Sequence, residues 1–90
     1  MNHRIGPPAA HIVEEELDDD IVLYDSERKQ FYELNPTASD VWRLATGEFT
    51  EDEIVDLLAS AYEVEPDELR TQVGEVLTMM TDAHLFADTE

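Results

Sequence analysis

The sequence predicts an α+β protein in which a small three-stranded antiparallel sheet is followed by three helices, in the arrangement of a winged helix-turn-helix. Two short runs of β-forming residues, separated by a polar break, lie between residues 20 and 34. Three segments with apolar residues at helical spacing follow, between residues 36 and 83. The chain has 90 residues, which is enough for one domain with a single thin core.

The stretch from Asp20 to Leu34 is predicted to be a β-hairpin. An aliphatic run that ends at Tyr24 forms the outgoing strand, residues 25–29 form the polar connection, and the return strand carries Phe31, Tyr32 and Leu34. Since Phe31 and Tyr32 are adjacent in a strand, they must face opposite sides of the sheet. One of the two is therefore expected in the core and the other at the surface, and the sequence leaves open which is which.

An additional strand is expected before the hairpin, near residues 11–15, with a turn around Asp18 and Asp19 and with Leu17 packing at its end. Residues 1–10 are expected to form an irregular N-terminal tail because they contain Gly6, Pro7 and Pro8, which leaves 11–90 as the folded domain.

The boundaries of the helices are marked by capping residues. Asn35 and Pro36 can begin a first helix that ends near Thr46, before Gly47.

Thr50 and Glu53 match a capping box for a second helix. A third helix is expected over residues 66–83, with Leu85 and Phe86 folding back onto the core.

The charge balance restricts the possible partners. With 23 acidic and 5 basic residues, the net charge is -18. Nucleic acids and anionic membranes repel such a polyanion, so we expect no nucleic-acid or membrane partner and favour cationic or apolar ones. An equally good explanation is that the excess of acid only keeps a small protein soluble. No apolar run is long enough to span a bilayer and no targeting segment is visible, which predicts a cytoplasmic location.

No residue pattern indicates catalysis. The chain has no cysteine, and His3, His11 and His84 are too scattered to form a known metal-binding motif. Three glycines do not form a phosphate-binding loop. We therefore expect no enzyme activity, no cofactor and no metal.

The order of these features resembles the PqqD-like family. The shared pattern is an aliphatic strand, a polar turn, two aromatics, Leu-Asn, a helix start of small residues with a Trp, and a Thr-x-x-Glu opening of the next helix, over about residues 12–86. The family consists of small winged-helix domains, also called precursor recognition elements, which bind leader peptides of ribosomally made, post-translationally modified peptides. The resemblance implies that an extended peptide binds between the third strand and the third helix.

Transferred to this sequence, the resemblance implies a peptide-binding site with two walls. An edge strand can accept an extended peptide through its unpaired backbone groups, while side-chain pockets supply selectivity. Core packing is the commoner explanation for each residue of the stripe on the third helix, and we also expect Met79 in the core. Arg28 and Lys29, beside the strand, could pair with acidic peptide residues or only discourage unwanted strand pairing. The candidate residues are Lys29, Gln30, Phe31, Tyr32, Glu33, Leu34, Leu69, Gln72, Val73, Val76, Leu77 and Met80.

The resemblance further implies a module that presents a precursor leader peptide to separate maturation enzymes. The favoured setting is the small leader-binding partner of a lasso-peptide leader peptidase. A chaperone for the precursor of pyrroloquinoline quinone, acting with a radical enzyme, is the alternative within the family. A protein-interaction adaptor with a folded partner is the alternative from another class.

Overall fold

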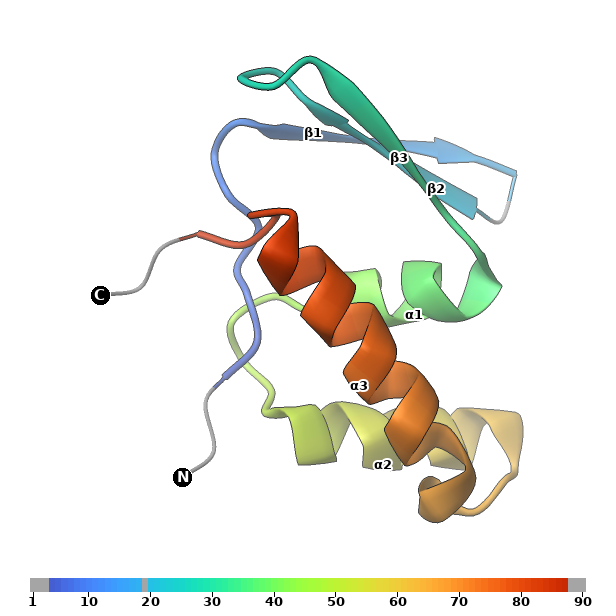
Figure 1. Cartoon of the computed structure of the whole chain (residues 1–90). Helices are drawn as coiled ribbons and strands as arrows, with labels where there is room; N and C mark the ends of the chain where they lie inside the picture. The colour runs from blue at the N-terminus through green and yellow to red at the C-terminus, as the bar shows by residue number, and fades with distance from the viewer. Residues whose placement is uncertain (1–3, 19, 88–90) are drawn as a thin grey trace.

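The computed structural model describes residues 4–18 and 20–87, and in it three strands precede three helices. The strands are β1 (Ile12–Leu17), β2 (Asp20–Asp25) and β3 (Gln30–Leu34), and the helices are α1 (Pro36–Leu44), α2 (Glu51–Tyr62) and α3 (Pro66–Asp82). The sheet forms a layer on one side of the helices (Figure 1). The predicted α+β order of elements is confirmed.

The sheet is antiparallel with the strand order β1-β2-β3. Ile21 pairs with Leu34 and Leu23 pairs with Tyr32, and the side chains of both pairs lie on the inner face, toward the helices. Ile21, Leu23 and Leu34 are buried there. The register therefore directs alternate residues of β2 and β3 into the core.

The first strand is longer than predicted because its inner-face acids have partners in α1. Glu14 accepts a hydrogen bond from Trp42 Nε1 at 2.9 Å, and Glu16 lies 3.7 Å from Arg43. The expectation that Leu17 packs against the core was wrong, because its side chain is 57% exposed. The predicted turn is described only at Asp18, which has a φ of 57°, since Asp19 lies outside the described residues.

The predicted first cap is present, but α1 ends earlier than expected. Asn35 Oδ1 accepts from the Ala38 amide at 2.8 Å. The helix ends at Leu44 instead of Thr46. A competing contact accounts for this end, because Gly47 donates its amide to the carbonyl of Ile5 at 2.7 Å.

The capping box of α2 is confirmed. Thr50 Oγ1 accepts from the Glu53 amide at 3.2 Å, and Glu53 Oε1 accepts from the Thr50 amide at 2.9 Å.

The core lies between the sheet and the helices, with Trp42 of α1 near its centre. Trp42 is buried and stacks on Phe86 with ring centroids 5.7 Å apart. Leu85 is also buried, so the predicted return of residues 85 and 86 to the core is confirmed. The buried Ser39 hydroxyl accepts from the Ile21 amide at 3.0 Å and donates to the Leu34 carbonyl at 3.2 Å, which joins α1 to the end of the hairpin.

The segment before β1 packs on loops and away from β3. Ile5 donates to the Phe49 carbonyl at 2.7 Å, and Ala9 donates to the Leu85 carbonyl at 2.9 Å. Between residues 4 and 10 the backbone is irregular apart from two isolated bridges, and residues 1–3 of the predicted tail lie outside the described residues. This segment therefore leaves the edge of β3 uncovered.

Candidate peptide-binding site

β3 is an edge strand with a free side. It pairs with β2, and no strand pairs with its other side in the part of the chain that the structure describes. Alternate residues of an antiparallel strand direct their amide and carbonyl groups away from the paired neighbour. This edge can therefore accept the backbone of another extended chain.

The opposite edge of the sheet is less suited to a peptide. β1 has the sequence IVEEEL with three consecutive glutamates, whereas β3 has the sequence QFYEL with one. A row of charges along an edge discourages pairing with another strand. The two edges of the sheet are thus chemically different, and β3 is the more receptive one.

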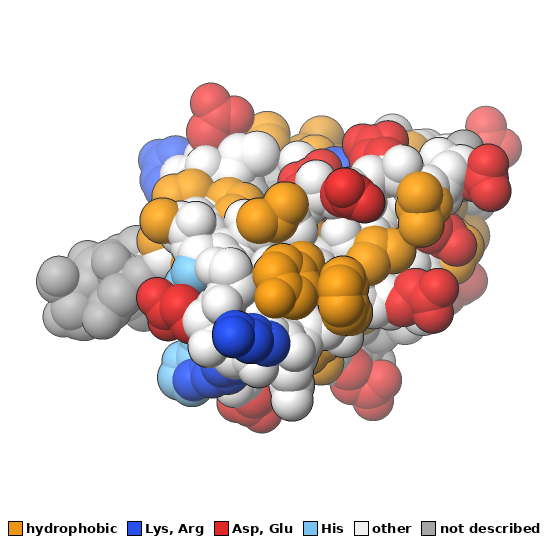
Figure 2. Space-filling view, turned by 90° about the horizontal axis from the view of Figure 1, so that it is seen from above, with side chains coloured by type: hydrophobic (Ala, Val, Ile, Leu, Met, Phe, Trp, Pro, Cys, Tyr) orange, Lys and Arg blue, Asp and Glu red, His pale blue; other side chains and the backbone are white. Residues whose placement is uncertain are grey.

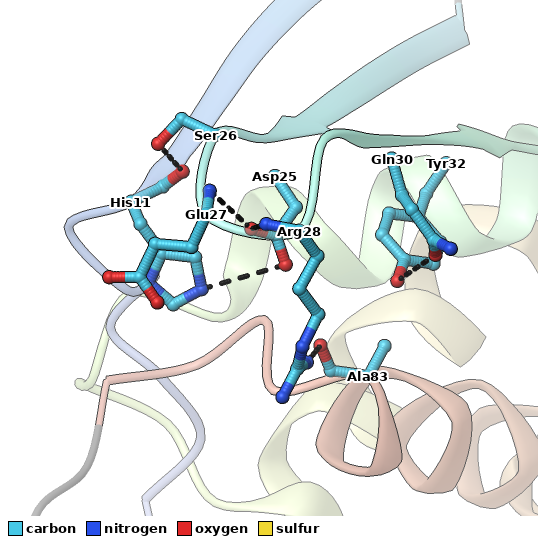
Figure 3. A network of polar contacts seen from close by, with 8 residues as sticks. All are labelled: His11, Asp25, Ser26, Glu27, Arg28, Gln30, Tyr32 and Ala83. Carbon is cyan, nitrogen blue, oxygen red and sulfur yellow. Dashed lines mark hydrogen bonds and ion pairs between the residues drawn. The ribbon is translucent and has the colours of Figure 1, made fainter.

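Tyr32 faces the helices. It lies opposite the buried Leu23 and packs against the core while remaining half-buried. Its hydroxyl donates to Gln30 Oε1 at 3.1 Å, and Figure 3 shows both side chains directed to the same side of β3. The side chain that lines the inner side of this edge is therefore that of Tyr32.

Phe31 lies on the outer face of the sheet. Its side chain is 72% exposed, and its ring centroid is 4.7 Å from that of Tyr24. Val13, opposite Tyr24 in the register, is 51% exposed. Figure 2, which views the sheet from above, shows apolar side chains gathered on this face.

Four of the candidate residues on α3 belong to the core. Their burial follows from the packing of α3 against α1 and α2, and a bound peptide could not touch them without displacing other core atoms. Leu34 of β3 is buried in the same way. These residues support the walls of a site from behind. The four on α3 are Leu69, Val73, Leu77 and Met80.

An accessible flank of α3 lies next to this core stripe. Gln72 is exposed and Val76 is half-buried against the core. Met79, which we expected in the core, is 40% exposed, so that expectation was wrong. Gln72, Val76, Met79 and Ala83 recur at helical spacing and therefore share one flank of the helix. We call this set the α3 flank.

The hairpin turn beside β3 is organised by Asp25. Its buried carboxylate accepts from the amides of Glu27 and Arg28, both at 2.9 Å, through Oδ1. His11 Nε2 lies 3.7 Å from Oδ2 (Figure 3). The amide of Arg28 is the main cause that lowers the pKa of Asp25, with further lowering by the Glu27 amide, while burial opposes the shift.

The lowered pKa of Asp25 predicts a pH-dependent stability. An unfolded Asp titrates near about 3.9, so the folded carboxylate stabilises the protein above that pH and loses its contribution as the pH falls through the lower folded pKa. Asp25→Ala should therefore lower the urea midpoint near neutral pH, and its difference from the unsubstituted protein should shrink in acid. Glu27→Ala, an exposed carboxylate of the same turn, is the control. A difference that stays constant into acid would contradict this account.

Arg28 connects the hairpin turn to the end of α3. Its Nη1 donates to the carbonyl of Ala83 at 3.1 Å, across 55 positions of sequence (Figure 3). Ala83 is the last residue of the α3 flank. The contact places the C-terminal end of α3 beside the hairpin turn.

Two hollows on the described surface have no residue of β3 in their lining. The larger is lined by α3, Ile5 and Glu51. The smaller lies between α1 and α2. Among residues 4–18 and 20–87, no group of three or more His, Asp or Glu residues is placed to hold a metal ion, and no helix is both long and apolar enough to cross a bilayer.

These features define a class of protein: a small sheet-and-helix domain with one receptive strand edge beside an amphipathic helix. Residues 20–85 match the family model described as coenzyme PQQ synthesis protein D (PqqD). The chain belongs to the PqqD family, which confirms the resemblance inferred from the sequence.

Two solved structures share this fold. One is described as TbiB1 in complex with the TbiA(beta) leader peptide. It has a TM-score of 0.80 and 20% identity, and the match covers 92% of this chain and 96% of that one. The other is described as lasso peptide synthetase B1 complexed with the leader peptide. It has a TM-score of 0.78 and 20% identity, with 91% and 96% covered. A search of curated proteins found no match.

Proposed function

We propose that this chain binds the leader segment of a ribosomally made precursor peptide by strand addition to β3. The free side of β3, with half-buried Tyr32 on its inner face, is the observation that carries the proposal. The two structural neighbours described above are complexes with leader peptides. Their fold matches this chain over nine-tenths of its length or more.

The two walls of the site contribute differently to binding. Backbone hydrogen bonds along β3 supply affinity that depends little on peptide sequence. Side chains of the added strand that face inward meet Tyr32 and the α3 flank, and those contacts supply selectivity. Of the candidate residues, we assign direct contact to Lys29, Gln30, Tyr32, Glu33, Gln72 and Val76 and, through its backbone alone, to Phe31, and we add Met79. The buried candidates hold these side chains in place.

Presentation to an enzyme needs a second surface. The outer face of the sheet, with Phe31, Tyr24 and Val13, stays open when a strand is added at the edge, and exposed apolar patches are typical of protein interfaces. A tethered leader keeps the rest of its precursor near the enzyme at a raised effective concentration. We propose the leader peptidase of a lasso-peptide pathway as the enzyme, in keeping with the structural neighbour described as lasso peptide synthetase B1.

We also propose that the chain binds its peptide without catalysing a reaction. A further part of the proposal is that α2 and α3, with the hairpin beside them, form a winged helix-turn-helix. Such an arrangement usually suggests DNA, but α3 carries four acidic residues against Arg70 as its only basic one. Phosphate contacts require Lys and Arg. The charge of α3 therefore favours a peptide ligand over DNA.

A backbone-amide titration tests the proposed site. Isotope-labelled protein is mixed with the TbiA(beta) leader peptide and, separately, with peptides of about 12 residues selected on the protein from a random library, long enough to cover the edge. We expect shifts along Gln30–Leu34 together with the α3 flank. If no peptide from either source produces them, the proposal fails. Shifts confined to residues 14–20 would favour the adaptor instead.

A further inference from the structure

The C-terminal end of α3 receives its positive charge from another element. The last turn of the helix contains no basic residue of its own. The final carbonyl groups of a helix carry partial negative charge and lack partners within the helix. Arg28 supplies both the charge and a donor, since its guanidinium binds the Ala83 carbonyl.

The backbone position of Arg28 is itself fixed. Its amide and that of Glu27 are held by the buried carboxylate of Asp25, and the Lys29 amide donates to the Asp25 carbonyl at 2.7 Å. Lys29 has a φ of 58°, so the chain reverses tightly into β3. The guanidinium therefore projects from a rigid turn instead of a mobile loop.

The contact lies where the two walls of the proposed site come together. β3 packs on α1, and α1 packs on α3, so α1 forms the floor between them. At the hairpin end, Arg28 reaches from the turn to the last residue of the α3 flank, and Figure 3 shows Gln30 and Tyr32 directed to the same side. The guanidinium thus crosses the end of the surface that lies between Tyr32 and the α3 flank.

We propose that Arg28 is a positioning residue that closes this end of the peptide site and sets the register of the bound leader. The inference rests on the proposed function. A peptide that pairs with β3 must stop or turn outward at Arg28, because its backbone cannot continue between the hairpin turn and Ala83. An end-stop of this kind solves a general problem of strand addition, in which backbone pairing alone permits slippage along the edge.

The test measures register and affinity together. The probe is the tightest peptide of about 12 residues selected from the random library, with a nitroxide attached to either end in turn. In the unsubstituted protein, one of the two labels should broaden the amide signals of residues 26–30 and leave those of residues 33–35, at the other end of β3, less affected. Arg28→Ala should spread the broadening to both groups, because several registers become populated, and should weaken binding about tenfold.

Three further variants separate positioning from a general loss of charge or fold. Arg28→Lys keeps a donor and should restore the single register. Arg70→Ala removes the same charge from the other flank of α3, where Arg70 pairs with Asp52 at 3.1 Å, and should behave as the unsubstituted protein. If Arg28→Ala fails to fold by circular dichroism, Arg28→Met, which keeps the length of the side chain without its donors, takes its place.

The outcomes distinguish this inference from the proposed function. If the labelled peptide occupies the site but keeps one register and an affinity within about twofold in Arg28→Ala, the inference is overturned and the proposed function stands. If no selected peptide reaches β3 in the unsubstituted protein, the proposed function itself fails. Multiple registers in Arg28→Ala that Arg28→Lys reverses would establish the end-stop.

Discussion

Val76→Asp is expected to abolish peptide binding while the protein remains folded. Val76 is half-buried against the core on the α3 flank, so a peptide in the proposed site would cover it. Covering an unpaired carboxylate removes it from water at a cost of several kcal/mol, which corresponds to a loss of affinity of roughly hundredfold or more. Fluorescence anisotropy with the selected peptide measures the effect.

The matched control for Val76→Asp is Thr78→Asp. Thr78 is exposed on the same helix, and it lies outside the α3 flank because residues two positions apart on a helix do not face the same side. The control adds the same charge and should change affinity little. If the two variants bind the peptide with equal affinity and both have intact far-ultraviolet circular dichroism, α3 is not part of the peptide-binding site.

Trp42→Ala should produce the largest loss of stability. The indole is buried at the junction of sheet and helices, stacks on Phe86 and donates to Glu14. Replacing a buried Trp by Ala costs roughly 3–5 kcal/mol, and a small domain has a total stability of about 5–15 kcal/mol. Urea unfolding should therefore show a strongly lowered midpoint.

Trp42→Phe separates packing from the hydrogen bond to Glu14. It keeps most of the apolar ring and removes the Nε1 donor, so its cost should be smaller than that of Trp42→Ala. A loss below about 1 kcal/mol for Trp42→Ala would show that Trp42 is not central to the core.

The elements that the sequence predicted well are those whose signals are local. Asn35, Pro36 and the Thr50 and Glu53 pair each determine a helix start through neighbours within a few positions. The two runs of β-forming residues around a polar break similarly predict the strands of the hairpin.

The features that escaped prediction depend on distant parts of the chain. Which of Phe31 and Tyr32 faces inward depends on the register, and the register depends on the turn that Asp25 organises. The contact of Arg28 with Ala83 joins residues 55 positions apart, and no local pattern indicates it. Met79 could have been assigned to the exposed flank from its helical spacing to Val76.

The glutamates of β1 have a consequence for how the protein behaves in concentrated solution. A molecule that keeps one strand edge available for a guest also offers that edge to its own copies, which is a common origin of aggregation. Here the second edge carries Glu14, Glu15 and Glu16, and the whole chain carries a net charge of -18, so copies repel one another before their strands can meet. This protection is electrostatic and weakens as salt screens charges beyond about 8 Å. One edge of the sheet, β3, is thus free to accept a peptide, while the glutamates of the other edge, β1, help to prevent self-assembly.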